Sequence, residues 1–236
     1  MSRTSVLCTE RIRPLPLSAR ETLISLYCPE SLQEEIRHSE PNNDYLARVY
    51  LGKRRDVNPP PKRFFSLRNF PLYLDQMEAL DLPTREYTKI MAETLALLHW
   101  GVKCDANDVE FVLGSASVFD TPSLDDDREG GLNNSNVRLW LLDFDQCKPI
   151  AMDIAGAEQA VNAYFRNDPY FPRPADEGPE GELWELFVKS YLHFTGDHWL
   201  ECCEFAEEFL AGVEGRCAKP RDPSHRCKHV PDGCLM

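Results

Sequence analysis

Apolar side chains recur every three or four residues in the middle of the chain, which is the spacing of one helix face. Thr84, which follows Pro83, is placed to cap the start of this helix. Two short apolar runs follow, at 109–113 and 137–144, and such runs are typical of strands. The sequence therefore predicts a core helix followed by a β-ribbon. The apolar face of the helix contains Tyr87, Ile90, Met91, Leu95 and Leu98.

The rest of the chain predicts more helices than strands. We expect Ser18 to cap the first helix, because a serine oxygen can accept a hydrogen bond from the first turn. The expected helices cover residues 18–26, 31–38, 69–80, 154–164, 182–193 and 198–213, and the expected short strands cover 6–12 and 45–51. The sequence therefore predicts an α+β fold that is mainly α-helical.

Polar and proline-rich stretches divide the chain. Residues 115–136 are rich in Asp, Asn and Gly, and a structureless loop longer than about 12–15 residues is usually functional or disordered. We expect a flexible acidic insertion there. The run 59–61 is three prolines, which predicts a surface loop because proline lacks a backbone N–H. We expect one domain over 1–212 and a flexible tail over 213–236.

Charge and cysteine content narrow the class of protein. The 236 residues include 26 Lys and Arg against 39 Asp and Glu, a net charge of −13. This excess argues against nucleic-acid binding, which needs clustered cations, and leaves a protein as the expected partner. The chain has no run of about eighteen apolar residues and no signal-peptide pattern, so we expect an intracellular protein, cytoplasmic or nuclear, without a membrane segment. Its nine cysteines are then expected to be reduced.

The two predicted strands carry two aspartates. Asp105 precedes the first strand, and Asp143 ends the second within Asp143-Phe144-Asp145. The order of a helix ending in Leu98-His99 and then two such aspartates resembles the lower lobe of protein kinases. The resemblance implies that Asp105 is the catalytic carboxylate. Its structural alternative is a turn residue that caps the following strand, and the alternative for Asp143 is an aspartate that ends a buried strand.

The same resemblance implies a site for magnesium and ATP. It places Asp143 as the magnesium ligand, with Glu110 and Asn107 beside it. The chain departs from the kinase pattern because Glu110 replaces an asparagine, Asp145 replaces a glycine, and Lys103 stands where His or Tyr is usual. No glycine-rich loop or phosphate-binding lysine motif is found in residues 1–85, so we expect a kinase-like lower lobe with a small β-ribbon and no upper lobe.

Six blocks of sequence are similar to a fungal domain family of unknown function, whose members are often labelled "zinc finger protein". The similarity spans roughly residues 6–190, and residues 6–12 look like the hinge that follows an upper lobe in fuller members. The blocks are 51–54, 65–77, 97–100, 105–114, 141–145 and 165–174. The last block gathers aromatic residues, which either pack beneath the domain or line a peptide-binding groove.

Zinc is a further candidate because metal-binding residue types gather near the end of the chain. Zinc sites usually pair their ligands as Cys-x2–4-Cys or His-x3–5-His. This region offers only Cys227-Lys228-His229 and a wider Cys227 to Cys234 spacing, so we expect no zinc site. The candidate ligands are Cys217, His225, Cys227, His229 and Cys234.

These patterns lead to three hypotheses about function. The leading hypothesis is a catalytically degenerate kinase-like module that binds a protein through its acidic surface and aromatic turn. The alternative is a kinase-like phosphotransferase that uses Asp105 and Asp143 with Mg and ATP. The second alternative is a zinc-dependent binding protein. Oligomeric state is not specified by any pattern in the sequence.

Overall fold

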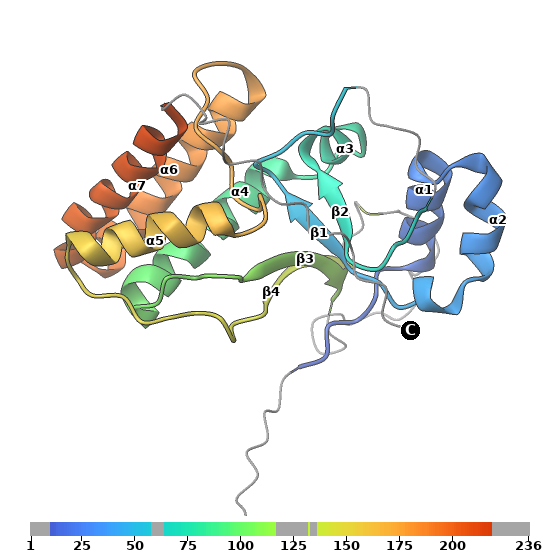
Figure 1. The fold of residues 1–236 in the computed structure, drawn as a ribbon, viewed down its shortest axis with the longest axis horizontal. Coiled ribbons are helices and arrows are strands. Elements are labelled where there is room, and N and C mark those ends of the chain that lie inside the picture. Colours follow the sequence, from blue (N-terminus) through green and yellow to red (C-terminus); the bar gives the residue numbers. More distant parts are fainter. Residues whose placement is uncertain (1–9, 58–63, 117–131, 133–135, 219–236) are drawn as a thin grey trace, which may run out of the picture.

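The fold is a mixed, mostly helical α+β structure (Figure 1). A computed structural model describes residues 10–57, 64–116, 132 and 136–218. Its longer helices are α1 (Leu17–Tyr27), α2 (Glu30–His38), α3 (Leu74–Ala79), α4 (Thr84–Ala96), α5 (Ile154–Arg166), α6 (Gly178–His198) and α7 (Cys203–Ala218). Three short helical segments are η1 (Glu40–Asn42), the π-helix η2 (Leu97–Val102) and η3 (Leu200–Cys202). The fold class predicted from the sequence is confirmed at this level.

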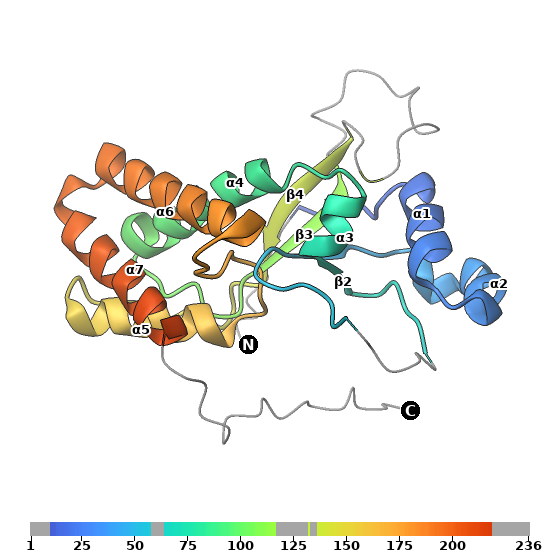
Figure 2. The same cartoon turned by 90° about the horizontal axis from the view of Figure 1, so that it is seen from above.

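A four-stranded sheet crosses the middle of the molecule in the order β2-β1-β3-β4. Its strands are β1 (Ala47–Tyr50), β2 (Phe70–Tyr73), β3 (Glu110–Ser115) and β4 (Val137–Leu142). β1 is parallel to β2 and antiparallel to β3, and β3 is antiparallel to β4. The predicted β-ribbon is therefore present as β3 and β4. Figures 1 and 2 show α4 to α7 on one side of this sheet and α1 and α2 on the other.

The start of the helix expected over 69–80 is wrong, because residues 70–73 form strand β2. β2 lies at the edge of the sheet, which is where a strand can contain a proline such as Pro71. Alternate residues Phe70 and Leu72 are buried, as the two-residue period of a strand requires. The helix α3 begins only at Leu74.

Two expected helix caps are also wrong. Pro16 occupies the N-cap of α1 and Pro83 that of α4, so Ser18 and Thr84 lie inside the first turns. The fixed φ of proline suits a helix start, and neither cap residue accepts a side-chain capping bond. The strand expected over 6–12 lies partly outside the described residues. Residues 10–12 are not in a strand, and Arg13 forms only a single bridge to Ser115.

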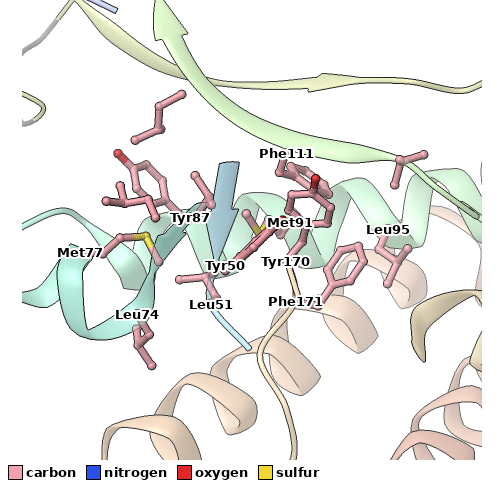
Figure 3. Close-up of a cluster of buried hydrophobic side chains, with 14 of the residues drawn as sticks. Tyr50, Leu51, Leu74, Met77, Tyr87, Met91, Leu95, Phe111, Tyr170 and Phe171 are labelled. Atoms are coloured by element: carbon pink, nitrogen blue, oxygen red, sulfur yellow. The ribbon is translucent and has the colours of Figure 1, made fainter. Parts of the chain in front are cut away.

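The core is built on the apolar face of α4, as the sequence predicts, except that Ile90 is 38% exposed and does not belong to the buried face. Met91 and Leu95 of α4 are buried between the sheet and α6, next to residues from several other elements (Figure 3). Tyr170 and Phe171 of the aromatic block lie in the same core and are 1% and 0% exposed. The aromatic turn therefore packs inside the molecule, and the expectation that it presents a docking face is wrong.

Two close contacts join separate blocks of sequence. The backbone N–H groups of Leu51 and Gly52 donate to the carbonyl oxygens of Tyr170 and Pro169, at 3.1 and 2.9 Å. A Cβ atom at Gly52 would lie 2.2 Å from the Phe171 carbonyl oxygen. Only glycine fits this close backbone approach.

Most of the regions that we expect to be flexible lie outside the residues that the structure describes. Residues 117–131, 133–135 and 219–236 are not described, and neither is the run 59–61. Two described parts of the acidic insertion are anchored: Ala116 donates a backbone hydrogen bond to Asn136 at 2.6 Å, and the Leu132 side chain is 3% exposed. α7 continues to Ala218, beyond the domain end expected at 212.

Within the described ranges, none of the helices combines the length and apolarity needed to cross a membrane.

Candidate functional site

The ribbon brings the predicted site residues to one end of the sheet. Asp105 and Asn107 lie in the turn between η2 and β3, Glu110 begins β3, and Asp143 follows β4. Glu110 pairs with Leu142, so Asp143 lies immediately beyond the residue opposite Glu110. Several non-glycine residues in the turn and at the end of the strand have a left-handed backbone conformation. Their φ angles are positive at Lys103 (61°), Ala106 (51°), Asp108 (65°) and Asp143 (68°).

The Asp105 side chain is buried and holds the turn together. It is 5% exposed. Its Oδ1 accepts hydrogen bonds from the backbone N–H of Lys148 at 2.8 Å and of Asn107 at 3.2 Å, and its Oδ2 accepts one from Gln159 Nε2 at 2.9 Å. An ionised carboxylate has about four acceptor positions. Most of the acceptor capacity of Asp105 is therefore used inside the protein.

The groups that hold this turn come from a later part of the chain. Asn167, which ends α5, accepts a hydrogen bond from the Asp108 N–H at 2.6 Å and donates to the Ala106 carbonyl oxygen at 2.9 Å. Gln159 of α5 binds Asp105, as described above. α5 thus clamps both ends of the turn. The polar residue Asn167 inside an aromatic block was the sequence signal for this role, and the sequence prediction missed it.

His99 lies beneath the turn as a packed, neutral side chain. It is 1% exposed, and its Nδ1 forms a hydrogen bond with the Tyr191 hydroxyl at 2.8 Å. Burial lowers the pKa of His99 to about 3, although the Asp105 charge opposes the change. The histidine is therefore uncharged at neutral pH and packed within the core.

Glu110 is bound to Arg48 of β1 in a half-buried ion pair. Arg48 also contacts Asp168, at 3.2 Å, and the Tyr50 hydroxyl donates to the same Asp168 oxygen at 2.5 Å. Burial raises the pKa of Glu110; Arg48 opposes this rise, whereas Asp143, Asp168 and Asp108 add to it. We call Arg48, Tyr50, Glu110 and Asp168 the Arg48 cluster. The sequence prediction included only Glu110 of this cluster.

Asp143 has a different environment from Asp105, because its side chain is exposed. Hydrogen bonding to Asp145 is the main cause of the raised pKa of Asp143, and burial and the Asp145 charge add to it. The pKa of Asp145 is lowered, chiefly by a hydrogen bond from Gln146. Asp143 thus follows the end of a strand, but β4 has no buried residue, so the structural alternative of a buried strand is wrong, and the Asp143 side chain is exposed to solvent.

The expected cofactor-binding residues lie at the same end of the sheet. Asn107 contributes its backbone, since its N–H binds Asp105 and its carbonyl oxygen accepts from the Cys147 thiol at 3.6 Å. Across the ranges that the structure covers, no group of three or more His, Cys, Asp or Glu side chains is arranged to hold a metal ion. Magnesium at Asp143 stays a prediction. Four of the expected zinc-ligand candidates, His225, Cys227, His229 and Cys234, lie outside the described residues.

Comparison with known protein families gives a match to part of the chain. Residues 139–201 match a family model described as "Zinc finger protein", a domain family of unknown function. The match covers Asp143, Gln159 and Asn167, but it does not reach Asp105 or Glu110. No curated protein and no solved structure matches the chain. The expected family similarity is thus shown for this segment, whereas the resemblance to protein kinases is not shown.

Proposed function

We propose that this chain is a catalytically degenerate, kinase-like protein-interaction module. The observation that carries the proposal is the state of Asp105, whose buried carboxylate accepts three hydrogen bonds from the protein. A catalytic carboxylate must reach the hydroxyl proton of a substrate. Asp105 is instead committed to holding its own turn, which supports a structural role.

The charges around the ribbon support the same conclusion. Phosphoryl transfer depends on cations that neutralise the triphosphate. At this end of the sheet Asp108, Asp143 and Asp168 lie close enough to Glu110 to raise its pKa, and Arg48 is already paired with Glu110 and Asp168. Residues 1–85 contain a single glycine, Gly52, and the Phe171 backbone fills the space beside it. A triphosphate would therefore meet mainly like charges.

An apolar surface suited to a partner lies where η2 meets the junction of α6 and η3. Leu97, Val102 and Leu200 are 44%, 60% and 76% exposed. Leu97 and Trp199 meet at Gly101, whose Cβ position lies 3.0 Å from Leu97 Cδ1 and 2.6 Å from the Trp199 ring. Val102 follows Gly101 in the chain, and Leu200 follows Trp199. We call Leu97, Val102, Trp199 and Leu200 the Trp199 patch. Isolated exposed apolar residues are common, but contiguous ones are typical of binding sites.

An acidic row begins beside the Trp199 patch. Glu201, Glu204 and Glu208 are all exposed and follow helical spacing along η3 and α7. An apolar surface bordered by carboxylates is complementary to an amphipathic helix with leucine-type side chains on one face and Lys or Arg beside them. We propose that such a helix, supplied by a protein partner, is the ligand of this patch.

The first test measures binding of a designed amphipathic helix of about five turns, with leucines on one face and lysines on the other. Fluorescence anisotropy should detect binding that Leu200→Asp weakens at least about tenfold, because a charge in an apolar contact is desolvated. Leu17→Asp is the matched control, since Leu17 is 67% exposed on α1, away from the patch. Equal affinity for the wild type and Leu200→Asp would reject the patch as the binding site. A higher affinity of Leu200→Asp would also reject it, because binding by charge attraction alone strengthens with an added carboxylate.

The second test concerns the phosphotransferase alternative. Thermal denaturation with millimolar Mg-ATP should show at most a small shift that Asp143→Asn leaves unchanged. Asparagine tolerates the left-handed backbone at this position, so the variant removes charge without adding strain. A micromolar dissociation constant that Asp143→Asn abolishes would make the phosphotransferase the leading hypothesis. One zinc per chain after gel filtration would instead favour zinc-dependent binding.

A further inference from the structure

Two cysteine thiols lie side by side on the short backbone pairing that holds the Asp105 turn. Cys104 is directly opposite Pro149 in an antiparallel bridge. Cys147 is two residues before Pro149, and residues two apart on an extended chain share a face. Cys104 and Cys147 are therefore diagonal neighbours on one face. The pairing is held by the N–H of Asp105 to the Lys148 oxygen at 2.9 Å and the N–H of Ile150 to the Lys103 oxygen at 3.0 Å.

The surroundings of this pair differ from those of the other described cysteines. Both thiols are half-buried and neither forms a disulfide. Burial raises the pKa of the Cys147 thiol to about 12, and the charge and hydrogen bonding of the neighbouring Cys104 thiol add to the rise. By contrast, Cys202 and Cys203 are adjacent in a helical stretch, where consecutive side chains point in different directions.

We propose that Cys104 and Cys147 form a redox-sensitive dithiol that closes to a disulfide when the protein meets hydrogen peroxide. The two thiols already interact, since the charge and hydrogen bonding of Cys104 act on Cys147. Diagonal neighbours on such a pairing lie about 7–8 Å apart, whereas a disulfide spans Cα separations up to about 6.8 Å. Closure therefore requires the turn that ends at Cys147 to move toward Cys104. The inference goes beyond the proposed function and does not depend on it.

The reaction balances with peroxide as the oxidant. The Cys104 thiolate attacks one peroxide oxygen and breaks the O–O bond, which gives a sulfenic acid and, after protonation, one water. The Cys147 sulfur then attacks the Cys104 sulfur, so that the S–S bond forms, the S–O bond breaks and a second water leaves. Two thiols thus lose two electrons and two protons, and peroxide is reduced to two waters.

The disulfide would join the two aspartate segments of the site. Cys104 immediately precedes Asp105, and Cys147 ends the turn that follows Asp143, where its N–H donates to the Phe144 oxygen at 3.2 Å. A covalent link here would fix the Asp105 turn against the segment after β4. We infer that oxidation stabilises the folded chain and that reductants reverse the effect.

Peptide mass spectrometry of the whole chain tests the proposal directly. Tryptic cleavage places Cys104 in peptide 104–128 and Cys147 in peptide 139–166, and each peptide contains one cysteine. After brief treatment with peroxide, the two peptides should appear as one disulfide-linked species that dithiothreitol separates. The melting temperature should rise by roughly 4–8 °C on oxidation and return on reduction.

Variants sharpen the assignment. Cys104→Ser and Cys147→Ser should each abolish the linked species and the reversible rise in melting temperature. Cys203→Ser is the matched control and should change neither. The proposal is overturned if the wild type yields sulfenic or sulfinic acid at these cysteines without the link, or if Cys104 pairs with a different cysteine. The wild-type result is decisive even where a variant folds poorly.

Discussion

Asp105 precedes β3 and Asp143 follows β4, the strand that pairs with β3. The two aspartates lie in opposite environments. Asp105 is buried and accepts three hydrogen bonds from the turn, α5 and the segment after β4. Asp143 is exposed, and the group with the largest effect on its pKa is another carboxylate, that of Asp145. The first aspartate is a structural support and the second is available to solvent.

This difference shows that a motif residue is defined by its hydrogen-bond partners as well as by its place in the sequence. A buried carboxylate must satisfy its acceptors within the protein, because leaving them unpaired is costly. The groups that satisfy Asp105 are Lys148 and Gln159, both within the segment that matches the family model, together with Asn107. We infer that one role of the matched segment is to hold the Asp105 turn.

The largest expected effect concerns pH and the buried histidine beneath the Asp105 turn. The pKa of His99 is lowered in the folded state to about 3 from an ordinary value of 6.5. Its contribution to stability is therefore complete above pH 6.5 and is lost as the pH falls toward 3. The free energy of unfolding should fall by up to about 1.4 kcal/mol per pH unit in this range, or about 3 kcal/mol by pH 4.

Urea unfolding at several pH values measures this slope. His99→Gln should lower stability at pH 7 and flatten the dependence between pH 4 and 6.5, because glutamine does not titrate. His193→Gln is the control, since His193 is exposed and should leave the slope unchanged. A wild-type slope that persists in His99→Gln would assign the pH dependence to other groups.

The second prediction compares the two aspartates by the same substitution. Asp105→Asn places an amide donor against groups that already donate, so it should reduce the free energy of unfolding by about 2 kcal/mol. Asp143→Asn keeps a residue that accepts the left-handed backbone and removes repulsion from Asp145. Its effect should be within about 0.5 kcal/mol of zero. Denaturant titrations that give equal effects for both variants would contradict the difference described above.

The smallest expected effect concerns Arg48, which connects β1 with Glu110 and Asp168. Arg48→Gln should destabilise the protein by about 1 kcal/mol at pH 7, because the site remains partly open to solvent, which screens the charges. The cost should shrink as the pH falls and the carboxylates become protonated. Arg11→Gln, which breaks an exposed pair with Asp44, is the control. Equal costs for the two variants at pH 7 would show that the Arg48 cluster behaves as a surface pair.

Local patterns in the sequence were sufficient for the main helices and the ribbon. The apolar spacing of α4 predicted its buried face through Met91 and Leu95, because a helix packs along one stripe of its own sequence. The short apolar runs of β3 and β4 predicted the ribbon, because such runs are typical of strands. They also placed Glu110 and Asp143 at one end of the sheet.

Only the tertiary structure decided what these residues contact. β2 was missed because Phe70-Pro71-Leu72-Tyr73 becomes a strand through pairing with β1, a partner that local spacing does not specify. Arg48 pairs with Glu110, which is distant along the chain, and Gln159 reaches Asp105 only because α5 packs against the turn. The buried carboxylate of Asp105 accepts hydrogen bonds from donors in several elements. The sequence alone therefore located Asp105, whereas the packing of α5 and the segment after β4 determined its structural role.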